Sequence, residues 1–161
     1  MNQAENQNNR PCITMAHMMM PQHANPHGNV HGGVIMKFID DAAAVIGQRH
    51  TRSTVVTAAI DSLSFHRPVY IGNLLTLRAA LNLTGKTSME IGVRVEAEDL
   101  IAGTTSHIAS AYLTFVAIDE KNHPLELTPH LPQTAEEERR HREALERRRH
   151  RDLLRKQNKS K

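Results

Sequence analysis

Residues 25–41, NPHGNVHGGVIMKFIDD, decide how this chain folds, because a glycine-rich turn leads directly into an apolar helical pattern. After Gly32 the apolar residues recur at the spacing of one helix face, and the pattern continues to about His50. That face consists of Val34, Ile35, Phe38, Ile39, Ala42, Ala43 and Ile46. We therefore predict one long helix that starts at His31 or Gly32 and buries a wide apolar stripe.

The chain on either side of this helix has the pattern of antiparallel strands. A short apolar run at residues 13–20 predicts a first strand, which Pro21 ends. β-branched and alternating residues predict four more, joined by connections of hairpin length, at residues 53–61, 74–83, 88–98 and 106–118. Because one helix covers only one face of such a sheet, we expect a second copy of the chain to bury the remaining edge or face.

Both ends of the chain differ in composition from this middle part. Residues 1–11 are polar and predict a disordered leader, residues 12–132 form the folded domain, and residues 133–161 predict a highly charged helix. Interleaved acidic and basic residues favour a solvated helix over a nucleic-acid contact. Its only large apolar residues are Leu145, Leu153 and Leu154, through which we expect any docking.

Composition argues against several classes of function. The 161 residues include no Trp, three Phe and two Tyr, so an aromatic stacking platform for nucleic acid is not expected. No apolar run is long enough to span a bilayer, and no signal-peptide pattern begins the chain. The single cysteine, Cys12, lies in a polar segment outside the expected core and forms no internal disulfide, which favours the cytoplasm.

The start of the predicted helix offers hydrogen-bond donors to a negatively charged oxygen. Its first N–H groups have no partner within the helix, and the helix dipole adds positive potential there. Glycine allows a substrate carbonyl to approach these donors, as in an oxyanion hole. Asp40 follows Gly33 by almost two turns and so lies on nearly the same side, whereas Asp41 can pair with Lys37.

Each of these residues also has a purely structural interpretation. Asp40 is either a general base or nucleophile, or a carboxylate that caps or pairs at the helix edge. Asn29 either caps the helix or orients a water or a carbonyl group, and His31 is either a ligand or a turn residue. We expect neither a metal nor a cofactor, because metal-ligand spacing is absent among His23, His27, His31 and His50.

Several motifs resemble hotdog-fold acyl-CoA thioesterases, in particular the cytosolic acyl-CoA hydrolase group of YciA-type and brain acyl-CoA hydrolase-like enzymes. The residues that carry the resemblance are GNVHGG at 28–33, VIMKFIDD at 34–41, VTA at 56–58, FHRP at 65–68 with Gly72, and TGKTSME at 84–90. It covers roughly residues 13–130. It implies an α+β fold in which a sheet wraps around the long helix, and two units that share one continuous sheet.

The resemblance also implies a reaction, the hydrolysis of fatty acyl-CoA to a free fatty acid and CoA. The backbone N–H of Gly33 would polarise the thioester carbonyl, and Asn29 would position the carbonyl or the water. Asp40 would come from the facing subunit and would activate water or attack directly. His31 belongs to the same group of candidate catalytic residues. The active sites would lie at dimer interfaces, commonly within a hexamer built as a trimer of dimers.

Further candidates lie where CoA would bind. Arg67, Lys86, Thr87 and Ser88 would meet its phosphates or pantetheine, since Arg and Lys suit phosphate oxygens and hydroxyls add hydrogen bonds. The structural alternative for each is a turn or strand-edge residue in contact with water.

Two other functions remain open. NPH at residues 25–27 echoes the Asn-Pro-x-His run of enoyl-CoA hydratases with the same fold. Those enzymes place an Asp where this chain has His23, and they have one more residue between Pro and His. A non-catalytic acyl-CoA sensor would bind thioesters without cleaving them, but no helix-turn-helix pattern precedes the domain. Turnover that depends on Asp40 would separate a hydrolase from a sensor.

Overall fold

The computed structural model describes residues 12–159, and the order of its elements is the predicted one. These elements are β1 (Cys12–Met18), the short 3-10 helix η1 (Pro21–His23), α2 (Gly32–Thr51), β2 (Thr54–Phe65), β3 (Leu74–Thr84), β4 (Ser88–Asp99), β5 (Thr104–Ile118) and α3 (Ala135–Lys159). The predicted leader, residues 1–11, lies outside the described residues. Cys12 is exposed, as expected, but it is the first residue of a strand and pairs with Ala80.

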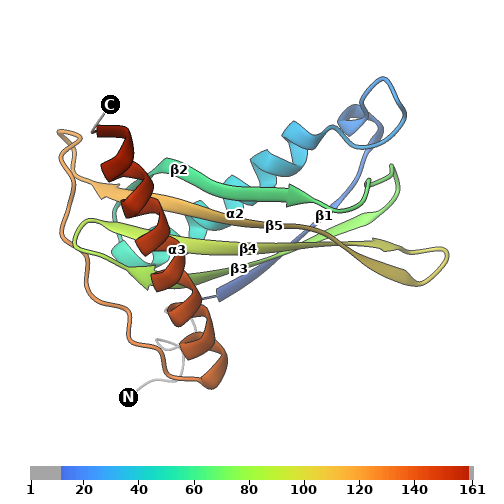
Figure 1. The fold of residues 1–161 in the computed structure, drawn as a ribbon. Coiled ribbons are helices and arrows are strands. Elements are labelled where there is room, and N and C mark those ends of the chain that lie inside the picture. Colours follow the sequence, from blue (N-terminus) through green and yellow to red (C-terminus); the bar gives the residue numbers. More distant parts are fainter. Residues whose placement is uncertain (1–11, 160–161) are drawn as a thin grey trace, which may run out of the picture.

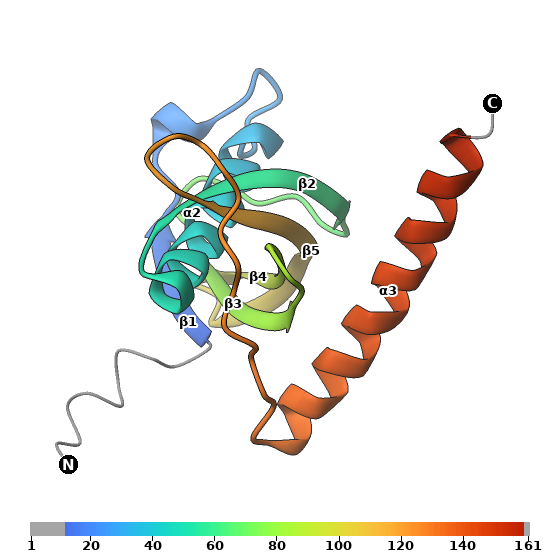
Figure 2. The same cartoon turned by 90° about the vertical axis from the view of Figure 1, so that its left-hand side faces the viewer.

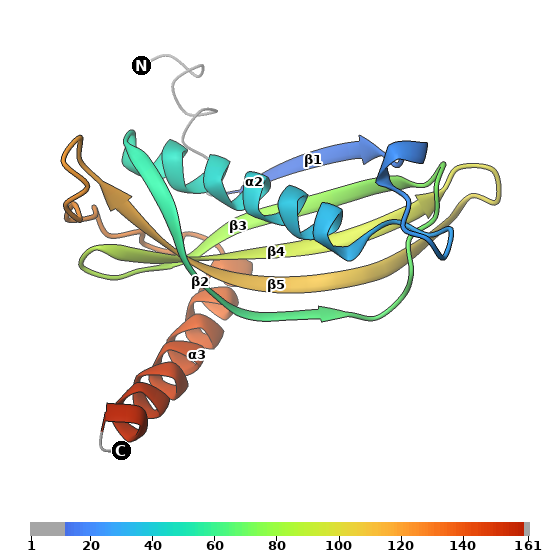
Figure 3. The same cartoon turned by 90° about the horizontal axis from the view of Figure 1, so that it is seen from above.

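The five strands form one antiparallel sheet in the order β1-β3-β4-β5-β2. The sheet curls around α2, which lies along its concave side (Figures 2 and 3). β2 was predicted to end at Asp61, yet it continues to Phe65 because it stays paired with β5 as far as Ala109. Two register shifts in this pairing allow the strand to bend while it follows the helix.

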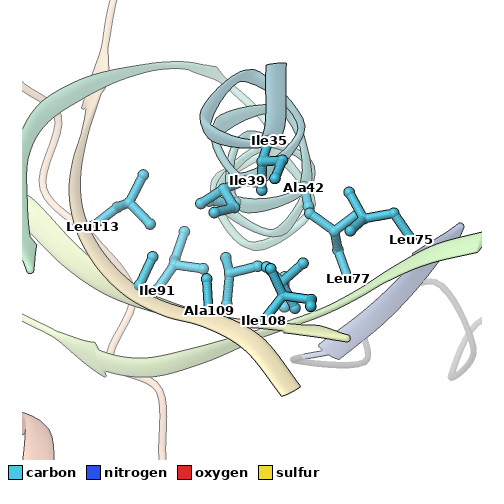
Figure 4. Packing of buried hydrophobic residues seen from close by; sticks show 14 of the residues in the cluster. Ile35, Ile39, Ala42, Leu75, Leu77, Ile91, Ile108, Ala109 and Leu113 are labelled. Atoms are coloured by element: carbon cyan, nitrogen blue, oxygen red, sulfur yellow. The ribbon is translucent and has the colours of Figure 1, made fainter. Parts of the chain in front are cut away.

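The core lies between α2 and the concave side of the sheet. Ile35, Ile39 and Ala42 of the helix point toward Leu77 and Ile91 of the strands (Figure 4), and all five are buried. The alternation predicted for β4 is confirmed, since Met89, Ile91, Val93, Val95 and Ala97 are buried on this side. The predicted α+β class, with one sheet wrapped around one long helix, is therefore confirmed.

The opposite side of the sheet is partly covered by α3 (Figure 1), so the same chain supplies some of the cover that we expected from a second copy. The prediction that α3 docks through its leucines is wrong for Leu153 and Leu154, because these side chains are 59% and 47% exposed. Ala144 is fully buried and Leu145 is half-buried, and charged side chains also hold the helix. Arg147 contacts Glu90 with Nη2 2.7 Å from Oε1, and Arg151 contacts Asp61. Glu90 is only 3% exposed, and the Arg147 guanidinium also lies 3.7 Å from the centre of the Tyr112 ring.

β2 is an edge strand that the described part of the chain leaves uncovered. None of its 12 residues is buried, whereas β3, β4 and β5 each bury several. Val56 and Ile60 are large apolar residues exposed on it. An uncovered edge strand with exposed apolar side chains is a natural place for a second chain to pair.

Candidate functional site

His31 caps the N-terminus of α2. It has extended backbone angles, and its Nδ1 accepts a hydrogen bond from the Gly33 N–H at 2.9 Å. A Cβ atom on residue 33 would lie 3.1 Å from that Nδ1, so a side chain here would crowd the imidazole ring. The N–H proposed for an oxyanion hole therefore already has an acceptor, and the alternative in which His31 bonds within the turn is confirmed.

The neighbouring Gly32 faces a cavity of about 350 Å³ at the end of the helix. Within residues 12–159 its N–H makes no hydrogen bond. The cavity wall also includes Asn29, Phe65, His66 and Arg67. Of the two glycines, Gly32 is thus the one whose donor is open to a ligand in this cavity.

Asn25 and Asn29 form the loop that leads into this helix. Asn25 Oδ1 accepts from the His27 N–H at 2.8 Å, and Asn25 Nδ2 donates to Asn29 Oδ1. Gly28, with φ +83°, closes the turn between them. Asn29 does not cap the helix, because His31 does. The second N–H of the Asn25 carboxamide has no acceptor within residues 12–159.

Asp40 is a half-buried carboxylate on the side of α2 that faces β2. Its Oδ1 accepts a hydrogen bond from Thr57 Oγ1 at 2.6 Å. Asp41 pairs with Lys37 at 2.6 Å, as predicted. Of these two adjacent aspartates, Asp40 is therefore the one without an ion pair to any described residue. A carboxylate oriented by one hydroxyl and not neutralised by a cation can accept a proton from water.

One chain does not bring Asp40 and the start of α2 to a common point. Seven residues separate Gly33 from Asp40, which corresponds to about 10 Å along a helix axis. The two groups lie on the same side, as predicted, but they are too far apart to act on one carbonyl group.

The residues expected to contact CoA also lie far apart within one chain. Arg67 is in the cavity wall beside Gly32, with Nη1 3.2 Å from Ser106 Oγ. Lys86, Thr87 and Ser88 lie at the β3–β4 turn, next to the C-terminal half of α2 and opposite to its N-terminus (Figure 3). Lys86 pairs there with Glu126 at 3.0 Å, and both side chains are exposed.

The described residues contain neither a metal-binding cluster nor a membrane helix. No three His, Cys, Asp or Glu side chains in residues 12–159 are placed to hold a metal ion. No helix in that part of the chain is both long and apolar enough to cross a bilayer. The expectation that no cofactor is needed stays a prediction.

Sequence reasoning missed Thr57 and Asn25 as partners of the candidate residues. Thr57 lies within the VTA motif, and only its position opposite Asp40 on the folded sheet reveals its contact. Asn25 was noted only for its likeness to a hydratase motif. Its spacing of four residues from Asn29 across a Gly-containing turn was the available signal that the two side chains meet.

Sequence comparisons with known proteins match this chain to thioesterases. Residues 27–104 match the family model of the thioesterase superfamily. A cytosolic acyl coenzyme A thioester hydrolase of Rattus norvegicus is 33% identical over 81% of this chain and 35% of the relative, so this chain spans about a third of its length. YkhA of Bacillus subtilis, named as an uncharacterized acyl-CoA thioester hydrolase, is 34% identical over 80% of this chain and 74% of the relative.

Two solved structures agree with this chain over at least 90% of its length. A hexameric acyl-CoA thioesterase has a TM-score of 0.86, 34% identity, and coverage of 90% of this chain and 93% of its own. An acyl-CoA hydrolase from Staphylococcus aureus, in complex with butyryl coenzyme A and coenzyme A, has a TM-score of 0.85, 30% identity, and coverage of 94% and 92%.

Alanine variants of the Staphylococcus aureus hydrolase have also been crystallised. They replace an asparagine, an aspartate 15 residues after it, and a threonine 17 residues after the aspartate. The sequence matches, the shared architecture and the extent of the overlap lead to one conclusion: this chain belongs to the thioesterase superfamily and has the hotdog fold of its acyl-CoA thioesterases.

Proposed function

We propose that this protein is an acyl-CoA thioester hydrolase whose active site is completed by a second copy of the chain. The observation that carries the proposal is the Thr57–Asp40 hydrogen bond, together with the spacing of Asn25 from Asp40 in the sequence. These residues have the same spacing, 15 and 17 residues, as the positions replaced in the Staphylococcus aureus hydrolase. The proposal assigns Asn25 a direct role, and Asn29 supports it by accepting one of its N–H groups.

In the proposed reaction, Asp40 takes a proton from a water molecule as the water oxygen bonds to the thioester carbon. The negative charge that develops on the carbonyl oxygen is stabilised by the Gly32 N–H and the second N–H of Asn25. The carbon–sulfur bond then breaks, CoA leaves as a thiolate and takes up the proton, and the fatty acid is released. The Gly33 N–H would first have to exchange His31 for the substrate, so Gly32 is the preferred donor.

Direct attack by Asp40 is the alternative chemistry. It would form a mixed anhydride between Asp40 and the acyl group, which water then hydrolyses. In a single turnover in H₂¹⁸O, label on the Asp40 carboxylate would show that the anhydride forms and that water cleaves it at the Asp40 carbonyl. Hydrolysis of the anhydride at the acyl carbon, or direct attack by water, leaves the Asp40 carboxylate unlabelled, whereas water attack on the Asp40 side of the anhydride labels it.

A second copy is required because Asp40 lies about 10 Å along α2 from the donors of its own chain. Pairing of two uncovered β2 edges would continue the sheet and place the two α2 helices side by side. Each Asp40 would then face the helix start of the other copy. The crystallised hexameric relative supports a hexamer as the assembly, built from three such dimers.

The same pairing gives the CoA contacts a physical basis. The β3–β4 turn with Lys86, Thr87 and Ser88 lies at the C-terminal end of α2. In an antiparallel dimer that end approaches the helix start of the partner, where Arg67 lies in the cavity wall. The two groups would therefore contact one CoA from different chains. By analogy with the cytosolic rat relative, we propose a cytoplasmic location.

The test is release of CoA thiol from acyl-CoAs of increasing chain length, followed with a thiol-reactive dye. We expect turnover by the wild type and a loss of at least about 100-fold in kcat for Asp40→Ala, as for loss of a catalytic base. Asp41→Ala is the matched control, because it removes the adjacent carboxylate, which only pairs with Lys37. It should keep wild-type turnover.

The outcomes also separate the alternatives. If the wild type binds CoA but releases no thiol from any substrate, the protein is an acyl-CoA sensor and the proposal is wrong. If Asp40→Ala keeps full activity with its assembly intact, hydrolysis occurs at another site. Hydration of an enoyl-CoA would appear as loss of ultraviolet absorbance without thiol release.

A further inference from the structure

We propose that neutral His31 is a positioning residue for the oxyanion site, and that its protonation switches off hydrolysis at acidic pH. This inference rests on the proposed hydrolase function. It starts from the single hydrogen bond that His31 Nδ1 accepts from the Gly33 N–H at 2.9 Å. An imidazole can accept a hydrogen bond only while that nitrogen carries no proton.

The cap determines how the first turn of α2 is placed. His31 is held from both sides, since its own N–H donates to the His23 carbonyl at 2.8 Å while its ring receives the Gly33 N–H. Its carbonyl accepts from the Val34 N–H at 2.9 Å. With Gly33 bonded to the ring, the Gly32 N–H is the donor left open to the cavity. Loss of the cap would free two glycines to move, and a misplacement of about 1 Å can reduce a rate 100-fold.

Histidine is an unusual choice for this position. Asn, Asp and Ser are the preferred N-cap residues and would accept the same hydrogen bond without titrating near neutrality. A Cβ on residue 33 would lie 3.1 Å from the ring, so glycine at this position leaves the ring room to accept the hydrogen bond. The ring is exposed, and protons from solvent therefore reach it.

Protonation of His31 weakens the cap of α2. A proton on Nδ1 removes the acceptor and places a positive charge against the positive end of the helix dipole. The charged ring then leaves the Gly33 N–H, and the first turn loses its anchor. Imidazole is the side chain whose charge ordinarily changes between about pH 5 and 8.

Other titratable groups surround this part of the fold. His23 lies on η1, and its Nδ1 accepts from the Met20 N–H at 3.1 Å. Lys37 and Asp41 on α2 are paired with each other. On the far side of Gly32, His66 and Arg67 line the cavity. The variants below separate His31 from these groups, because each leaves all of them in place.

The experiment measures kcat and KM from pH 5 to 9 for the wild type, His31→Asn, His31→Ala and His27→Asn, using thiol release from one acyl-CoA. We expect the wild-type kcat to fall at least tenfold from pH 8 to 5. His31→Asn restores a cap that does not titrate, so its kcat should match the wild type within about threefold at pH 8 and stay nearly constant to pH 5. His31→Ala should lose at least about tenfold in kcat at every pH, with little change in KM.

His27→Asn is the matched control, because it removes a histidine of the same loop whose ring makes no hydrogen bond within the described residues. It should keep the wild-type profile. The inference is overturned if His31→Asn keeps the wild-type fall in kcat at acidic pH, or if His31→Ala equals the wild type. Absence of turnover by the wild type would instead reject the proposed function. Should His31→Ala fail to fold, the comparison between the wild type and His31→Asn still decides.

Discussion

In the proposed reaction, the Thr57 hydroxyl prepares the Asp40 carboxylate for chemistry. Its Oγ1 donates to Asp40 at 2.6 Å and fixes one of the two carboxylate oxygens toward the uncovered edge of the sheet. A hydrogen bond to a charged group contributes about 1.5–3 kcal/mol. Thr57→Val keeps the shape of the side chain and removes only this donor.

We expect Thr57→Val to lower kcat by about 10-fold to 100-fold, the rate change that corresponds to such a bond. KM should change little, because the hydroxyl orients the base and not the CoA. The measurement is steady-state thiol release, with Thr54→Val on the same strand as the control. Equal losses in both variants would show that the strand is merely perturbed.

Some contacts of the candidate site residues could be predicted from the sequence, and others could not. Asp40 was chosen over Asp41 as the candidate because helical spacing separates the two, and the Asp41–Lys37 pair is present as expected. The partner of Asp40 could not be found, because Thr57 is 17 residues away and only the curl of the sheet brings it close. Gly33 was interpreted as making room for substrate, whereas it makes room for the His31 ring, a contact between two residues that spacing alone does not specify.

The segment between β5 and α3 shows how a linker is fastened by histidines. His50 Nε2 lies 2.8 Å from the Thr128 carbonyl, and the His130 N–H donates to Thr84 Oγ1 at 2.9 Å. Burial of the His130 ring lowers its pKa below the ordinary value of 6.5, and the nearby positive charge of Arg140 acts in the same direction. Glu137 opposes this shift but does not reverse it.

A lowered pKa in the folded state makes stability depend on pH. Above pH 6.5 His130 is neutral in both states, so its full contribution to stability is present. As the pH falls below 6.5 the unfolded chain takes up the proton first, and stability is lost until the folded state is protonated too. We expect the free energy of unfolding, measured in urea at pH 7.5 and 5.5, to fall more for the wild type than for His130→Asn. His150→Asn, on the exposed face of α3, should behave like the wild type.

Strands and helices were predictable where local pattern determines them. β4 alternates so regularly that its buried side was assigned correctly, and α2 begins at one of the two residues predicted for its start. α3 was predicted as a helix, but not its contacts, because the sheet surface it meets is polar and the partners of Arg147 and Arg151 come from two distant strands. The true end of β2 depends on pairing with β5, which no local signal contains.

Assembly is the level at which the catalytic residues would meet. If Asp40 acts on substrate held by the partner, two inactive variants should restore each other. We expect a mixture of Asp40→Ala and Asn25→Ala, unfolded and refolded together, to recover about a quarter of wild-type activity, since half of the dimers are mixed and each has one intact site. The measurement is thiol release before and after mixing.

Two controls make this result decisive. Each variant refolded alone should remain inactive. A mixture of Asp40→Ala with the wild type should show no more activity than the number of sites with an intact Asp40 allows. If the mixture of the two variants stays inactive although light scattering shows mixed assemblies, then the two residues act within one chain. That outcome would contradict the shared site without contradicting hydrolysis itself.

The distance of about 10 Å between the start of α2 and Asp40 has a consequence for the cell as well as for the enzyme. If hydrolysis needs residues of two chains, as proposed, a newly synthesised chain that has not yet met another copy would be silent toward its substrate, however well it is folded. At low expression the rate of thioester loss should therefore rise with the square of the protein concentration and become linear only when every chain is paired. Gene dosage would then change the turnover of the cell's acyl-CoA pool more than proportionally while expression is low.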